Sequence, residues 1–134
     1  MSAHSLNVLS ALREQTDEMV SDLAALVNCE SPSRAEEALA ECAVVVSEMF
    51  AKRVGRAAEF VSPAPGFSAG PHLHWRGGGQ SSVLILGHYD TVFPAGTVES
   101  RPFACDGTVA TGPGVFDMKA AIVQAVFPVA SLPS

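Results

Sequence analysis

Residues 83–93 read VLILGHYDTVF, so that four apolar residues run directly into a glycine, a histidine, a tyrosine and an aspartate. The run from Val83 to Leu86 has no polar position that could face water, which is typical of an interior strand covered on both faces. Such strands belong to helix-flanked, largely parallel or mixed sheets, so the stretch predicts the α/β class. Ligands of these folds gather at the carboxyl ends of strands, and we therefore expect His88 and Asp90 to lie at that edge.

The flanking sequence supplies helices and short strands. Apolar residues recur at three- and four-residue steps between Leu6 and Val27, which predicts one amphipathic helix. Ser33 stands three residues before Glu36 in the pattern of a capping box, and a second helix should run from there to about Gly55. Two strands are expected over residues 57–61 and 72–76, and GGGQSS, residues 77–82, should form the turn before the interior strand.

Composition narrows the class of protein. The chain of 134 residues is of the size of one domain, and its net charge of -6, from 8 Lys and Arg against 14 Asp and Glu, argues against nucleic acid or an anionic membrane as partner. Three widely spaced cysteines, Cys29, Cys42 and Cys105, fit buried reduced thiols better than disulfides or a zinc knuckle. The N-terminus lacks a signal-peptide pattern, and the apolar tail AAIVQAVFPVA is too short to span a bilayer. We expect a soluble cytoplasmic protein.

His88 and Asp90 form the first candidate site. Residues two apart in an extended segment project to the same side, so the Asp90 carboxylate can accept the ring N–H of His88 and leave the other ring nitrogen for a metal. The pattern His-x-Asp is short, however, and taken alone it favours the simpler interpretation of a capped histidine at a strand end.

The second candidate site is TGPGVFDMKAA, residues 111–121. Gly112 and Gly114 provide the backbone freedom for a tight turn, and Asp117 follows where a helix should begin. Asp117 is therefore either a helix N-cap or a carboxylate held rigidly enough to bridge two divalent cations. The spacing alone does not choose between them.

Together, GHYDTVFPAGT, RPF, DG and TGPGVFDMKAA resemble, in this order, the first two motifs of the di-zinc metallopeptidases that include carboxypeptidase G, aminoacylases, acetylornithine deacetylase and succinyl-diaminopimelate desuccinylase. The resemblance covers most of the chain up to about Phe127, and LVNCESPS, residues 26–33, resembles the segment after the family's first helix. It implies a zinc-exopeptidase-like sheet flanked by helices and a site for two Zn²⁺ ions. The implied reaction is hydrolysis of a small peptide or an N-acyl amino acid, and the form HYDTVFPAGT favours the glutamate carboxypeptidase-like branch.

Carried over by position, the resemblance implies that His88 is a terminal ligand of one zinc ion and that Asp117 bridges both. Asp90 would orient His88 and count among the catalytic residues. The peptide bond between Asp117 and Met118 is expected to be cis.

The departures from the family are equally specific. After Asp117 the sequence has no Asp, Glu or His, so the general base and the remaining metal ligands of the family are missing, as is the dimerisation domain found in full-length relatives. Ala121 stands where the family usually has glycine. We therefore interpret residues 1–134 as the N-terminal part of a metallopeptidase catalytic domain, inactive as this fragment. The alternative is a non-enzymatic truncated remnant that binds at most one metal weakly.

Other polar residues fit simpler roles. His72 and His74 alternate on one predicted strand and could hold a metal, but an exposed strand beside Trp75 explains them better. Lys119 is expected to be solvated or salt-bridged one turn into a helix. Asp106 and Gly107 form a turn signal without a catalytic role.

Overall fold

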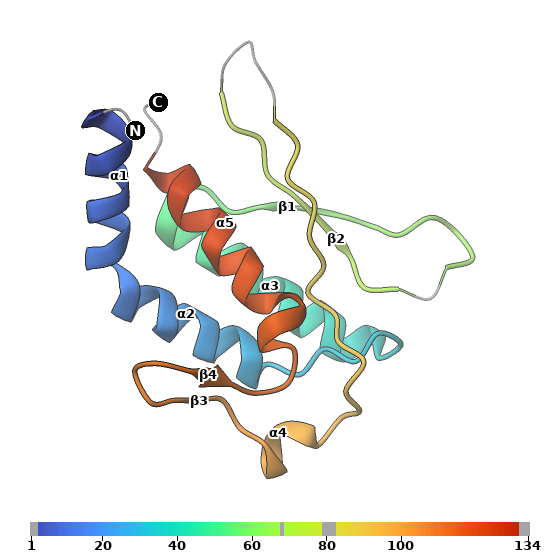
Figure 1. Ribbon diagram of the computed structural model, residues 1–134. Helices are drawn as coiled ribbons and strands as arrows, with labels where there is room; N and C mark the ends of the chain where they lie inside the picture. Colours follow the sequence, from blue (N-terminus) through green and yellow to red (C-terminus); the bar gives the residue numbers. More distant parts are fainter. Residues whose placement is uncertain (1–2, 68, 79–82, 132–134) are drawn as a thin grey trace.

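The computed structural model describes residues 3–67, 69–78 and 83–131, and within them helices dominate (Figure 1). In chain order the elements are α1 (Ala3–Glu14), α2 (Thr16–Asn28), α3 (Glu36–Val54), β1 (Glu59–Val61), β2 (His72–His74), α4 (Thr97–Ser100), β3 (Ala104–Cys105), β4 (Ala110–Thr111), a π-helical turn η1 (Val115–Lys119) and α5 (Ala120–Ala130). The combination of helices with small sheets agrees with the α/β class in its coarse sense.

The apolar stripe between Leu6 and Val27 forms two helices, not the single helix that we predicted. The break lies at Gln15, whose backbone N–H bonds to the carbonyl of Leu12 at 3.2 Å. The hydroxyl of Thr16 donates to the carbonyl of Arg13 at 2.7 Å. Side-chain bonds of this kind compete with the regular helical ladder, so a helix commonly changes direction there.

Helix α3 ends as predicted and begins differently. Gly55 follows its last residue with φ of 75°, the left-handed conformation that glycine adopts at helix C-termini. The predicted capping box is wrong, because the N-cap is Ala35, without a side-chain hydrogen bond, and the Ser33 hydroxyl donates instead to the carbonyl of Thr91 at 3.1 Å.

The core lies where α2, α3 and α5 pack together, with α5 crossing in front of α3 in Figure 1. Its buried residues are Leu23, Leu26, Val27, Cys42, Val46, Met49, Val123, Val126 and Phe127. Burying each of the larger side chains stabilises the fold by about 1.5–3 kcal/mol. The three cysteines are free, as predicted, but only Cys42 is buried, since Cys29 is half-buried and Cys105 is exposed.

The sheets are small and antiparallel, whereas we predicted a largely parallel or mixed one. Strands β1 and β2 lie within the two ranges expected for them and pair with Phe60 opposite Leu73. Strands β3 and β4 form a second ribbon. Among the described residues the single parallel pairing outside these ribbons is an isolated bridge between Pro32 and Thr91.

The prediction of a buried strand over residues 83–86 is wrong in this structure. These residues form no strand, and Val83, Leu84, Ile85 and Leu86 are 90%, 78%, 59% and 78% exposed. Their apolar pattern indicates that a strand here would need other parts of the protein against both of its faces. None of the described segments pairs with residues 83–86. The predicted turn before it lies mostly in residues 79–82, outside the described residues.

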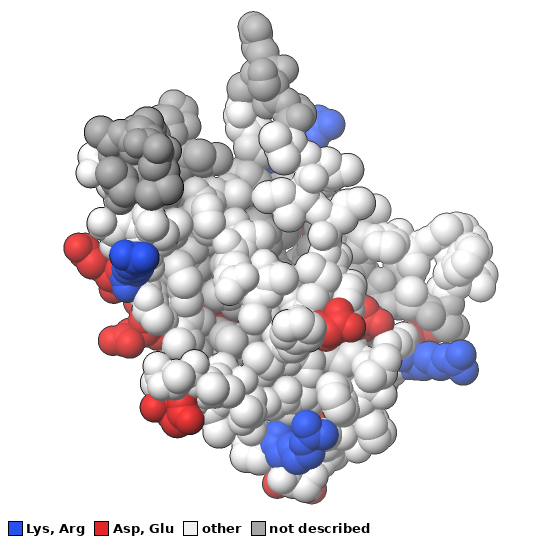
Figure 2. All heavy atoms as spheres, in the orientation of Figure 1, with Lys and Arg blue, Asp and Glu red and all other residues white. Residues whose placement is uncertain are grey.

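Within the described residues no helix combines the length and hydropathy that a bilayer span requires. On the face seen in Figure 2, Lys and Arg side chains appear as separate spots, and a broad area without charged side chains covers the centre.

Candidate metal-binding site

His88 lies between two carboxylates. Its Nδ1 is 3.1 Å from Oδ1 of Asp90, and its Nε2 is 3.0 Å from Oδ1 of Asp117. The structure therefore brings together all three residues that the sequence singled out, although the strand expected to present them is absent. The contact between His88 and Asp90 is the one predicted from their spacing.

The two carboxylates change the acidity of the imidazole. Partial burial of the ring lowers the pKa of His88, but the hydrogen bond to Asp117 and the contacts with Asp90 outweigh burial and hold the pKa above its ordinary value. A proton on the ring is therefore retained to higher pH than on a free histidine. A cation that binds at Nε2 must displace this proton.

The segment that carries His88 and Asp90 is held by backbone and hydroxyl contacts with the segment after α2. The Ser31 hydroxyl donates to the Tyr89 carbonyl at 2.7 Å, and the Thr91 N–H donates to the Ser31 carbonyl at 2.8 Å. The N–H of Ser33 donates to the Thr91 carbonyl at 3.0 Å. Tyr89 and Thr91, on either side of Asp90, are thus bonded to Ser31 and Ser33, about 58 positions away in the sequence.

Asp117 lies in a turn that precedes α5, and the N-cap alternative for it is wrong. Its backbone is not helical, with φ of -125° and ψ of 96°, and the residue before α5 is Lys119. The peptide bond between Asp117 and Met118 is cis, in agreement with the prediction. The turn is closed by a bond of 3.0 Å from the Lys119 N–H to the Gly114 carbonyl.

The two loops contact each other at Gly114. A Cβ atom at this position would lie 2.4 Å from Cγ2 of Thr91, so only glycine allows the approach, and its φ of 73° also favours glycine. The tight turn predicted for residues 112–114 therefore serves to bring the Asp117 loop against the segment that carries His88.

Lys119 is buried, and the prediction of a solvated side chain is wrong. It is 1% exposed, and its ammonium group donates to the carbonyls of Leu26 at 2.9 Å and Cys29 at 2.8 Å, at the C-terminus of α2. Burial lowers the pKa of Lys119 below its ordinary value. A signal was present in the sequence, because Lys119, Val123 and Val126 follow the spacing of the buried face of α5.

Glu30 is a further structural residue, for which the sequence predicted no role. Its carboxylate accepts hydrogen bonds from the backbone N–H groups of Gly96 at 2.7 Å and Val98 at 2.9 Å. These bonds, with that of Val98 the largest contribution, lower the pKa of Glu30. Residues 26–33 thus bond both to residues 89–91 and to residues 96–98.

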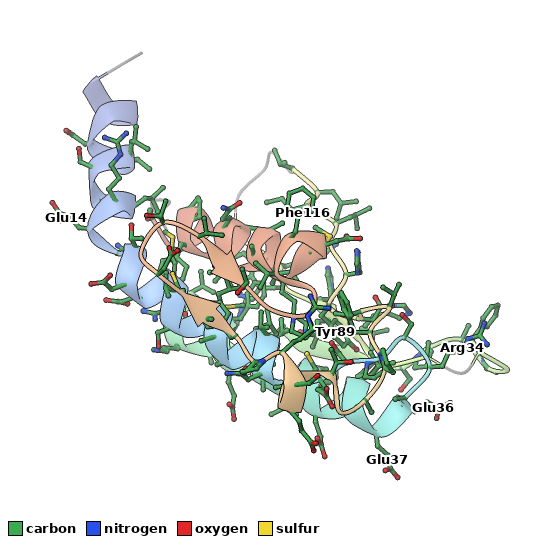
Figure 3. All side chains as sticks on the ribbon, turned by 60° about the horizontal axis from the view of Figure 1, so that its bottom comes forward. Glu14, Arg34, Glu36, Glu37, Tyr89 and Phe116 are labelled. Atoms are coloured by element: carbon green, nitrogen blue, oxygen red, sulfur yellow. The ribbon has the colours of Figure 1, made fainter. Side chains whose placement is uncertain are left out.

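The space around His88 and Asp117 is an open hollow of about 270 Å³. His88, Asp90 and Asp117 line it together with apolar groups that include Phe93 and Phe116. Phe116, labelled in Figure 3, is 96% exposed at the rim. The hollow is accessible to a small molecule that carries both a polar and an apolar group.

The donor atoms fit part of a zinc site. Two adjacent ligands of a tetrahedral zinc ion, each at about 2.0–2.1 Å from the metal, lie about 3.3 Å apart, close to the 3.0 Å between His88 Nε2 and Asp117 Oδ1. Among the described residues there is no group of three or more His, Cys, Asp or Glu side chains that could hold a metal ion. His72 and His74 are both exposed on β2 and are not part of such a group. Within the described residues, His88 and Asp117 are thus two side chains at a ligand-like separation, whereas a catalytic zinc normally has three protein ligands.

Comparison with known proteins adds no family assignment, since no protein-family model and no curated protein sequence matches the chain.

Proposed function

We propose that this chain carries part of a zinc-dependent hydrolase site for amide bonds of peptides or N-acyl amino acids, of the glutamate carboxypeptidase-like type. The observation that supports this best is the chain of contacts from Asp90 through His88 to Asp117, with separations of 3.1 Å and 3.0 Å. A histidine that binds a metal through one nitrogen commonly donates its other N–H to a carboxylate.

In this proposal each residue has a distinct role. His88 Nε2 and the Asp117 carboxylate are ligands, and Asp117 is placed at the rim, 82% exposed, where its second oxygen is open to a further cation. Asp90 holds the tautomer of His88 in which Nε2 is free to bind. A zinc ion bound there would act as a Lewis acid toward an amide carbonyl.

A complete hydrolytic site also needs a general base and a third ligand. The described residues contain no metal-binding group of three side chains, so activity would require carboxylates from outside them. We therefore infer that the chain by itself hydrolyses neither N-acyl amino acids nor glutamyl peptides when zinc is added.

The same observation favours a second candidate, a non-enzymatic chain that binds one metal ion weakly. Two ligands, of which Asp117 is 82% exposed, provide less affinity than a closed set of three or four. The two candidates differ in whether hydrolysis appears when carboxylate ligands from outside the described residues complete the site.

Titration calorimetry with Zn²⁺ tests the ligand assignment. We expect one weakly bound ion per chain, lost in His88→Ala and in Asp117→Asn. His72→Ala is the matched control, because His72 is exposed on β2 and should leave binding unchanged. Equal zinc binding by all four proteins would contradict the assignment, and hydrolysis abolished by His88→Ala would contradict the inferred inactivity of this chain.

A further inference from the structure

Residues 26–33, the end of α2 and the segment after it, contact both halves of the candidate site. One end of this stretch receives the side chain of Lys119, two residues after Asp117. The other end receives the backbone of residues 89–91, which carry Asp90 and directly follow His88. No other stretch of the described chain makes hydrogen bonds to both neighbourhoods.

The Lys119 contact is a buried one. Lys119 is 1% exposed, and its ammonium group bonds to two carbonyls, those of Leu26 and Cys29, which the end of α2 leaves without helical partners. A cation at a helix C-terminus is also favoured by the helix dipole. The side chain thus ties the Asp117 turn to α2.

Ser31 makes the corresponding contact with the segment that carries His88 and Asp90. Ser31 is 1% exposed, and its hydroxyl and carbonyl bond to Tyr89 and Thr91 at 2.7 Å and 2.8 Å. Cys29, which accepts the Lys119 bond, and Ser31, which bonds to Tyr89 and Thr91, are two residues apart. The two sets of contacts are therefore made by one short piece of backbone. The separation between His88 and Asp117 then depends on that piece, together with the direct contacts between the two loops, where the His88 N–H lies 3.4 Å from Sδ of Met118 and Gly114 lies against Thr91.

We infer that Lys119 and Ser31 are positioning residues, which hold Asp117 and His88 at their mutual distance by fixing both loops to residues 26–33. A displacement of about 1 Å in either loop would remove the contact between Nε2 and Oδ1, because hydrogen bonds are lost beyond about 3.5 Å. The inference rests on the proposed function in that it takes these two side chains as a ligand pair, but the positioning itself needs no metal.

The first experiment uses the metal-free protein and measures the imidazole ¹⁵N resonances of His88 at one fixed pH, assigned with His88→Ala. Asp117→Asn shows how the Nε2 signal changes when its partner is altered. We expect Lys119→Met and Ser31→Ala to shift the Nε2 resonance in the direction of Asp117→Asn. Lys52→Met is the matched control, since the only other lysine is 60% exposed and pairs with Asp22 on α2.

The outcomes are separable from loss of folding. Far-ultraviolet circular dichroism identifies any variant that unfolds. If Lys119→Met loses its helices, the test of the inference is made with Ser31→Ala, which removes only one hydroxyl. A folded Lys119→Met or Ser31→Ala protein with the wild-type His88 spectrum would overturn the inference.

Zinc binding then separates the inference from the proposed function. If wild-type protein binds Zn²⁺, we expect Lys119→Met to weaken affinity by about tenfold or more, as removal of supporting contacts around metal ligands does, and Lys52→Met to leave it unchanged. Wild-type affinity in folded Lys119→Met would overturn the inference. If wild-type protein binds no Zn²⁺, the proposed function fails, and the nitrogen resonances still decide whether Lys119 and Ser31 position His88 and Asp117.

Discussion

The imidazole of His88 and the carboxylate of Asp117 are 29 positions apart in the sequence, yet Nε2 and Oδ1 are 3.0 Å apart in the structure. Neither residue belongs to a regular helix or strand that would fix this distance. The neighbouring residues hold the two loops through contacts of Ser31 with Tyr89 and of Lys119 with α2. The loops also contact each other directly, where Gly114 lies against Thr91 and the His88 N–H lies 3.4 Å from Sδ of Met118. The candidate site is therefore as rigid as the packing of two loops on the end of one helix.

The two lysines should differ sharply in chemical reactivity. Lys52 is 60% exposed, whereas Lys119 is 1% exposed and bonded to two carbonyls. In the folded protein an amine-reactive ester should acylate Lys52 rapidly and leave Lys119 unmodified, as measured by peptide mass mapping. In urea both should react, which serves as the control. Equal labelling of the two lysines in the folded protein would show that Lys119 is accessible and that the tie to α2 does not form.

Which features the sequence could predict depends on how far away the partner lies. The end of α3 at Gly55 was predictable because a helix terminus is a local property. The role of Ser33 was not, because its partner Thr91 is 58 positions away and the competing capping box looked locally complete. The apolar run at Val83 indicates a need for cover on both faces, but not whether any strand provides it.

In the candidate site, too, contacts between residues close in the sequence were predictable and contacts between distant residues were not. The contact between His88 and Asp90 follows from their two-residue spacing, whereas burial of Lys119 depends on where α5 meets α2. A charged residue suggests a surface position, and the regular spacing from Lys119 to Val123 and Val126 was the weaker of the two signals.

Phe127 should be a principal stabilising residue. It is 1% exposed in the core, and the Arg53 guanidinium lies 4.7 Å from its ring centre. Phe127→Ala should lower the free energy of unfolding by about 3–5 kcal/mol, because it removes buried apolar area and leaves a cavity. Phe116→Ala is the matched control, since Phe116 is 96% exposed and its loss should change stability by less than about 0.5 kcal/mol. Urea denaturation of both variants measures the difference, and similar losses would contradict the position of the core.

Glu30 should make stability depend on pH in the acidic range. Its pKa is lowered by the hydrogen bonds from Val98 and Gly96, so the unfolded chain binds the proton more readily than the folded one. The stabilisation is then present above the unfolded value of 4.5 and is lost as pH falls through the lower folded value.

Comparison with Glu30→Gln isolates this contribution. The variant should be less stable by about 0.5–1 kcal/mol at neutral pH, as expected for loss of a charged acceptor at backbone N–H groups. Denaturation between pH 7 and pH 3 should show the difference shrinking below pH 4.5. A difference that stays constant over this range would mean that the carboxylate does not make these bonds. Glu59→Gln, at an exposed position on β1, is the control.

The exposed run Val83–Leu86 should make the protein associate with itself at high concentration. Four consecutive apolar side chains that are 59–90% exposed, on backbone without a sheet partner among the described residues, have the properties of an unprotected edge strand. Leu84→Lys should reduce the association, because a lysine on such an edge opposes pairing with a second chain. Val44→Lys is the matched control, since Val44 is a single apolar residue, 45% exposed, on the surface of α3. Sedimentation velocity over a range of concentrations measures the effect. If Leu84→Lys associates as strongly as the wild type and as Val44→Lys, the contact between molecules involves another surface.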